Sequence, residues 1–171
     1  MKEIIEVIRY TVPAMVVFFA AYFLLKEFFL QESKKREIDI KLEKVRITMP
    51  IRLQAYERII LFLERISPSN LVMRVHQLGY SSAEFQKVLV QTIRDEYSHN
   101  LSQQLYVSAK AWEMVKTARE EMIRQINTSA AQLPSEATST DLSNKLLEMS
   151  MEKLATRKAL DFLKDEARQN F

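Results

Sequence analysis

The chain has 171 residues, of which 47% are hydrophobic and 27% are charged, a composition typical of a folded protein and too apolar for a disordered one. It contains one glycine and four prolines. Tight β-turns usually need glycine, whereas helices form well without either residue, so an all-α fold is predicted. The absence of cysteine excludes disulfides, thiolate metal sites and cysteine nucleophiles.

The formal net charge of +3 is unevenly distributed along the chain. Residues 1–31 sum to zero, residues 32–52 hold seven Lys/Arg against four Asp/Glu, and residues 53–171 hold 15 of each sign. The excess positive charge therefore lies in one short segment that follows the apolar N-terminal region. Nucleic-acid binding would need a basic stripe on the folded domain itself, so no nucleic-acid partner is predicted.

An uncharged, mostly apolar stretch runs from Tyr10 to Leu25. Its sixteen residues would span roughly 24 Å as a helix, and Phe28–Leu30 extend the apolar surface toward the roughly 30 Å of a bilayer core. A transmembrane anchor is therefore predicted over residues 1–31. A cleaved signal peptide and a buried core helix are the alternatives. The residues expected to meet the membrane are Tyr10, Pro13, Phe18, Phe19, Tyr22, Phe23 and Lys26.

Lys and Arg residues are more frequent after this stretch than before it, with Lys2 and Arg9 before and seven from Lys26 to Arg46 after. The positive-inside rule then predicts a single-pass protein of the inner membrane. Its N-terminus would be outside and its C-terminal domain cytoplasmic, with the lipid bilayer as one partner.

Residues 32–49 are expected to form a basic juxtamembrane helix that continues from the anchor. Ile38, Leu42, Val45 and Met49 are spaced as on one helix face, although Ile38, Ile40 and Leu42 also alternate as in a strand. Thr48 is expected to cap a new helix that has Pro50 in its first turn.

Residues 50–171 are predicted to form a bundle of about five helices. Residues 67–70 (SPSN) are expected to separate the first two helices, and Gly79 to end the second as a left-handed cap. Residues 81–84 (SSAE) match a capping box. A polar loop over residues 134–141 precedes a last helix from about Thr140.

Few residues carry recognisable chemistry. Glu96 and His99 match the E-x-x-H spacing of di-iron bundles, but a complete site needs that motif twice plus two further glutamates; they are weak candidate metal ligands. No Ser-His or Cys-His hydrolase pattern is present, and the glycines of phosphate-binding loops are missing. No catalytic residue, cofactor or nucleotide is therefore predicted.

Two stretches, IRLQAYERIILFLERISPSNL at 51–71 and IRDEYSHNLSQQLYVS at 93–108, resemble an uncharacterised family of Bacteroidota membrane proteins. The resemblance implies one N-terminal span and a helical domain, and it implies no known activity. Six residues are predicted to contact a partner because they occupy helix and loop positions of mixed polarity: Arg52, Gln54, Tyr56, Glu57, Arg58 and Asn70.

The predicted function is a non-enzymatic, membrane-anchored interaction or scaffold module, such as a subunit or adaptor of an inner-membrane complex. A protein partner or a homo-oligomer is expected, since several helices have more than one apolar face. The alternative is a metal-dependent enzyme that uses Glu96 and His99.

Overall fold

The computed structural model describes the backbone of residues 2–77, 79–150 and 155–170, and the side chains of residues 15–77, 79–149 and 156–169. Within these ranges the chain is all-helical, as predicted, and it divides into two units, Met1–Thr48 and Met49–Phe171. The elements are α1 (Lys2–Arg65), α2 (Pro68–Val75), α3 (Ser82–Asn100), the 3-10 helix η1 (Leu101–Leu105), α4 (Ala109–Ala131), α5 (Ser139–Ser150) and α6 (Ala155–Asn170).

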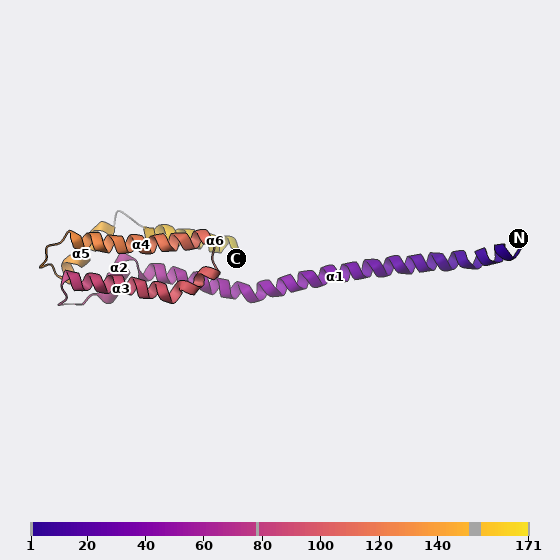
Figure 1. Cartoon of the computed structure of the whole chain (residues 1–171), viewed down its shortest axis with the longest axis horizontal. Helices are drawn as coiled ribbons and strands as arrows, with labels where there is room; N and C mark the ends of the chain where they lie inside the picture. Colours follow the sequence, from indigo (N-terminus) through magenta and orange to yellow (C-terminus); the bar gives the residue numbers. More distant parts are fainter. Residues whose placement is uncertain (1, 78, 151–154, 171) are drawn as a thin grey trace. The chain divides into compact units, whose positions relative to one another are not determined.

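The second unit is a helical bundle in which α5 and α6 both pack against α4, while α3 packs against α4 and α5 (Figure 1). The last part of α1 supplies one face of the core through side chains at helical spacing. The core is aliphatic and aromatic, and its fully buried side chains include Ile59, Phe62 and Leu63 of α1, Phe85, Leu89 and Ile93 of α3, Val115 and Ile126 of α4, Leu142 and Leu146 of α5, and Leu163 of α6.

The predicted capping box at the start of α3 is confirmed. The Ser81 hydroxyl oxygen accepts a hydrogen bond from the backbone N–H of Glu84 at 3.3 Å, and the Ser81 N–H donates to the Glu84 carboxylate at 3.0 Å. A second box of the same kind, which the sequence reading missed, begins α5: the Thr138 N–H donates to Asp141 Oδ2 at 2.9 Å. The Ser82 N–H donates to the Ala137 carbonyl at 2.8 Å, so backbone bonds tie the predicted polar loop to the start of α3.

Three predicted boundaries are wrong. Thr48 does not cap a new helix, because α1 continues through Pro50 and the Thr48 hydroxyl donates to the Lys44 carbonyl one turn earlier at 2.8 Å. Gly79 has the expected left-handed φ of 95°, but α2 ends at Val75 and has His76 as its C-cap. The predicted last helix is two helices, α5 and α6.

The predicted transmembrane anchor is also corrected. In the part of the chain whose side chains the structure describes, no helix has an apolar stretch long enough to cross a membrane. The apolar run of that part extends from Met15 to Leu25 and ends at Lys26 and Glu27. A spanning helix needs about 20 predominantly apolar residues, and the two charges separate this run from Phe28–Leu30. Tyr10 and Pro13 lie outside the described side chains, and the other predicted membrane residues, Phe18, Phe19, Tyr22, Phe23 and Lys26, are exposed.

Candidate interaction surfaces

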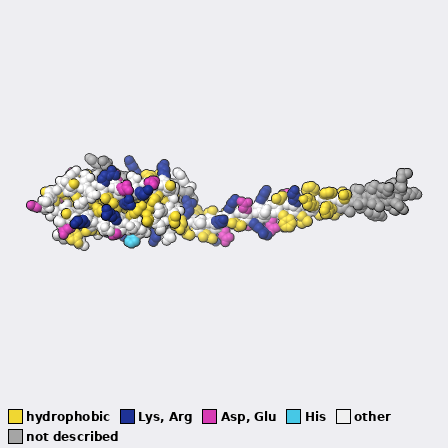
Figure 2. All heavy atoms as spheres, viewed as in Figure 1, with side chains coloured by type: hydrophobic (Ala, Val, Ile, Leu, Met, Phe, Trp, Pro, Cys, Tyr) yellow, Lys and Arg dark blue, Asp and Glu magenta, His cyan; other side chains and the backbone are white. Residues whose placement is uncertain are grey.

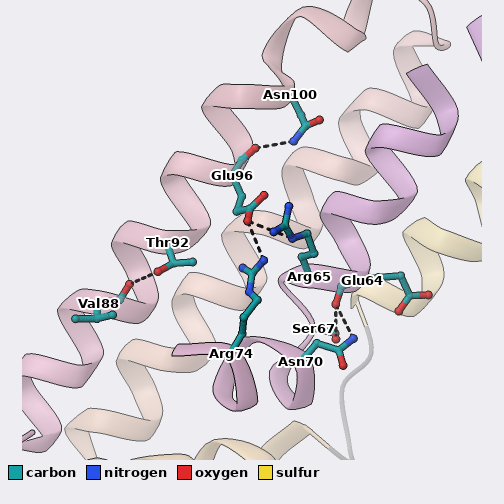
Figure 3. A network of polar contacts seen from close by, with 9 residues as sticks. All are labelled: Glu64, Arg65, Ser67, Asn70, Arg74, Val88, Thr92, Glu96 and Asn100. Carbon is teal, nitrogen blue, oxygen red and sulfur yellow. Dashed lines mark hydrogen bonds and ion pairs between the residues drawn. The ribbon is translucent and has the colours of Figure 1, made fainter. Parts of the chain in front are cut away.

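The six predicted contact residues do not form one surface. Gln54, Glu57 and Arg58 are exposed on α1, where residues three and four positions apart share a face. Asn70, in contrast, donates its side-chain amide to the Glu64 carbonyl at 2.9 Å (Figure 3). The same carbonyl, in the last turn of α1, also accepts from the Ser67 hydroxyl at 2.7 Å, so Asn70 helps to cap the end of this helix.

Tyr56 belongs to the core rather than to a contact surface, and only 1% of it is exposed. Its hydroxyl donates to the carboxylate of Glu166 on α6. The same carboxylate accepts from the backbone N–H of Ser108 at 3.2 Å and from the Ser108 hydroxyl. The Ser108 oxygen in turn accepts from the Ala111 N–H at 3.0 Å, which caps α4. The network therefore joins three helices at one end of the bundle.

Burial and hydrogen bonding shift the acid–base behaviour of this network. Burial raises the pKa of Tyr56 to about 12, and the adjacent Glu166 carboxylate adds to the shift. Burial alone would raise the pKa of Glu166, but the hydrogen bonds from Ser108 and Tyr56 outweigh it, so that the pKa lies below its usual value. Arg52, another predicted contact residue, lies beside this network and donates Nε to the Tyr106 carbonyl at 3.4 Å.

A polar groove lies between α1 and α3 within the second unit. It encloses about 420 Å³ and is lined by side chains of both helices: Arg58, Leu61, Phe62, Arg65, Glu96, His99 and Asn100. Figure 3 shows Glu96 of α3 directed toward two guanidinium groups. Its Oε1 lies 2.9 Å from Nη1 of Arg74 and 3.4 Å from Nε of Arg65. Thus α2, which bears Arg74, also contributes to the groove's charge.

Positive charge exceeds negative charge in and beside this groove. Arg58 and Arg65 line the groove and Arg74 reaches it through its ion pair, whereas Glu96 is the one carboxylate of the groove lining. The Glu96 side chain is only 16% exposed, whereas that of Arg65 is 46% exposed. Among the described residues, neither Arg58 nor His99 has a hydrogen-bond or ion-pair partner. The groove therefore presents unused donors to a ligand.

A second surface lies on α1 within the first unit. From Met15 to Thr48, every described side chain except that of Glu32 is exposed, and Figure 2 shows hydrophobic side chains there between charged ones. Ile38, Leu42 and Val45 follow the four-then-three spacing of a coiled-coil seam. Ile40 and Ile47, which are seven residues apart, lie on the opposite side of the helix. Each follows a residue of the first set by two positions, and a two-residue step turns a helix by roughly 200°. These are called the first stripe (Ile38, Leu42, Val45) and the second stripe (Ile40, Ile47).

Comparison with known proteins identifies the family. The model of a family of unknown function, DUF7935, matches residues 2–170. The chain belongs to this family. No curated protein and no solved structure matches it. The family description names no activity, membrane association or organism, so the resemblance to Bacteroidota membrane proteins stays a prediction.

In this member of DUF7935 the predicted metal ligands do lie together, since Glu96 and His99 both line the groove. Their surroundings favour an anion over a metal ion, because Glu96 is already paired with two guanidinium groups. The described residues also contain no group of three His, Asp or Glu side chains that could hold a metal ion. Arg65 and Arg74 were expected from the sequence to form interhelical ion pairs, and both pair with Glu96. Sequence reasoning missed the role of Glu166, whose partners are distant in the chain.

Proposed function

We propose that this DUF7935 chain is a non-enzymatic interaction module that associates with helices of other polypeptides through α1. The observation that carries the proposal is the pair of exposed aliphatic stripes on α1. Their five side chains are between 54% and 62% exposed. Isolated exposed aliphatic residues are ordinary on protein surfaces, but contiguous apolar surface marks sites of interaction.

The spacing of the first stripe favours a helical partner. Ile38, Leu42 and Val45 correspond to alternating seam positions, and Asp39, Lys41 and Arg46 occupy flanking positions, where charges select a partner and its orientation. A partner helix packed on this seam would remove the three side chains from water. Each would contribute on the order of 1 kcal/mol if about half of its surface were buried.

The second stripe widens the surface that a partner could cover. Ile40 and Ile47 lie nearly opposite the first stripe, so a helix packed on one side of α1 leaves the other side free. A helix with two apolar sides is suited to the interior of an assembly with more than two helices. The absence of cysteine and of phosphate-binding loops agrees with a role that requires no catalysis.

The test is photo-crosslinking in the native cell with a photoreactive amino acid placed at position 42. We expect a defined adduct at position 42 and none at the exposed position 94 of the bundle. The adduct's mass identifies the occupant as a second copy or as another protein. If position 42 yields only uncrosslinked chain, the proposal is overturned.

A substitution series measures how much the first stripe contributes. Leu42→Lys is expected to weaken the captured association at least about tenfold, because a charge in an apolar seam costs more than 1.4 kcal/mol. Lys44→Ala, two positions away and outside both stripes, is the matched control and should leave the affinity unchanged. Equal affinities for wild type and Leu42→Lys would exclude the first stripe as the interface.

A further inference from the structure

We infer that the groove between α1 and α3 is a second binding site, which takes carboxylate side chains from an acidic segment of a partner protein. The inference uses residues of the bundle and none of either stripe, so it stands or fails independently of the proposed function.

Arg58 is the principal donor. Its side chain is exposed, lines the groove and has no hydrogen-bond or ion-pair partner among the described residues. Among the described residues, Arg65 makes one ion pair, from Nε to Glu96 at 3.4 Å, which does not occupy its terminal nitrogens. A guanidinium group binds a carboxylate through two parallel N–H···O bonds, and these charge-assisted bonds are stronger than neutral ones. Both arginines can therefore receive an acidic side chain.

Glu96 acts as a positioning residue in this site. Because its Oε1 accepts a hydrogen bond from Arg74 and forms an ion pair with Arg65, it holds two long side chains at the edge of the groove. Because these two side chains are already held in place, they lose less conformational entropy when a ligand binds. The Asn100 amide donates to the Glu96 carbonyl at 2.8 Å, a bond that fixes the end of α3 beside the same groove (Figure 3).

The composition of the groove favours a peptide over a polyanion. Leu61 lies between Arg58 and Arg65 on the same side of α1 and is 54% exposed, so the site offers an apolar contact between two cations. Nucleic-acid binding depends on neutralising many phosphates, whereas residues 53–171 carry 15 charges of each sign and the groove itself contains a carboxylate. A short segment with separated acidic residues fits these conditions better.

The spacing of Arg58 and Arg65 along α1 defines the expected ligand. They are seven residues apart on α1, which corresponds to roughly 10.5 Å along the helix axis. A helical partner segment would match them with two acidic residues two turns apart and an aliphatic residue between. The expected ligand therefore has an acid–aliphatic–acid sequence pattern.

The test titrates the full chain into a fluorescent, alanine-based helical peptide that carries two glutamates seven residues apart and one leucine between them. We expect saturable binding, read by anisotropy, that Arg58→Glu weakens at least about tenfold. A peptide with lysines in place of the glutamates should regain affinity for Arg58→Glu. Arg94→Glu changes an exposed arginine of α3 that does not line the groove, and as the matched control it should bind like wild type.

The inference would be overturned if the glutamate peptide did not bind, or if Arg58→Glu and Arg94→Glu weakened its binding equally. It would also be overturned if the lysine peptide did not bind Arg58→Glu more tightly than the glutamate peptide does. Competition by inorganic phosphate as strong as that by the peptide would instead identify a phosphate site. Thermal unfolding of each variant shows whether a loss of binding reflects a loss of folding. Because Arg58 is exposed and pairs with none of the described residues, we expect no change in the unfolding temperature.

Discussion

Replacing Phe62 with alanine is expected to lower the free energy of unfolding by about 3–5 kcal/mol, the usual cost of removing a buried aromatic side chain. Phe62 is 1% exposed, and its ring centroid lies 6.0 Å from that of Tyr97. Trp112, whose ring stacks on Tyr97 at 5.5 Å, is the only tryptophan of the chain. Its fluorescence therefore reports unfolding in a urea titration without any added probe.

Leu61 provides the control for this experiment. It precedes Phe62 on α1 but is 54% exposed, so Leu61→Ala should change the free energy of unfolding by less than about 1 kcal/mol. The contrast tests which face of α1 is buried in the bundle. Similar losses for the two variants would contradict the burial of Phe62 in the core and the exposure of Leu61.

The second large effect is expected at Glu166, where replacement by alanine should lower the free energy of unfolding by about 3 kcal/mol. Removing the carboxylate leaves the Tyr56 hydroxyl, the Ser108 hydroxyl and the Ser108 N–H without their acceptor. Hydrogen bonds to a charged group contribute about 1.5–3 kcal/mol each, and partial access of water to the site reduces the sum. Asp165→Ala, at the exposed neighbouring position, is the matched control and should have little effect.

The same network predicts how stability depends on pH. The pKa of Glu166 in the folded chain lies below its usual value, so its contribution is present at neutral pH and is lost as the pH falls through the acid range. The pKa of Tyr56 is raised to about 12 from 10.0, so its contribution is present below pH 10 and is lost as the pH rises toward 12. Urea midpoints of wild type and Glu166→Gln, measured across pH, check both signs. A wild-type curve with the same acid slope as that of Glu166→Gln would contradict the role of Glu166.

The amino-acid sequence by itself determined the elements whose signals are local. The capping box of Ser81 and Glu84 joins atoms three residues apart, and the helical spacing of Phe85, Leu89 and Ile93 places them on one buried face. The scarcity of glycine was enough to predict an all-α fold. These features depend on contacts within one or two helical turns, which neighbouring residues specify without the rest of the chain.

Predictions from short stretches of sequence were wrong where the same stretch was compatible with two different structures. Thr48 and Pro50 resemble the start of a helix, but a proline can lie inside a helix whose other bonds continue, and the Thr48 hydroxyl bonds back to Lys44. The membrane span was predicted from the uncharged stretch Tyr10–Leu25 with Phe28–Leu30 as its extension, whereas no helix in the described part of the chain is long and apolar enough to cross a membrane.

Only the tertiary structure decided which distant polar groups meet. Tyr56 and Glu166 are 110 residues apart in the sequence, and Arg74 meets Glu96 across two different helices. Arg74 and Glu166 resemble ordinary surface residues in their local sequence, since Arg and Glu are mostly exposed, whereas Tyr56 and Glu96 were predicted to be a partner-contact residue and a weak candidate metal ligand. Their pairing follows from the packing of whole helices around a shared core, because that packing alone brings the buried Tyr56 hydroxyl and the groove arginines to their carboxylates.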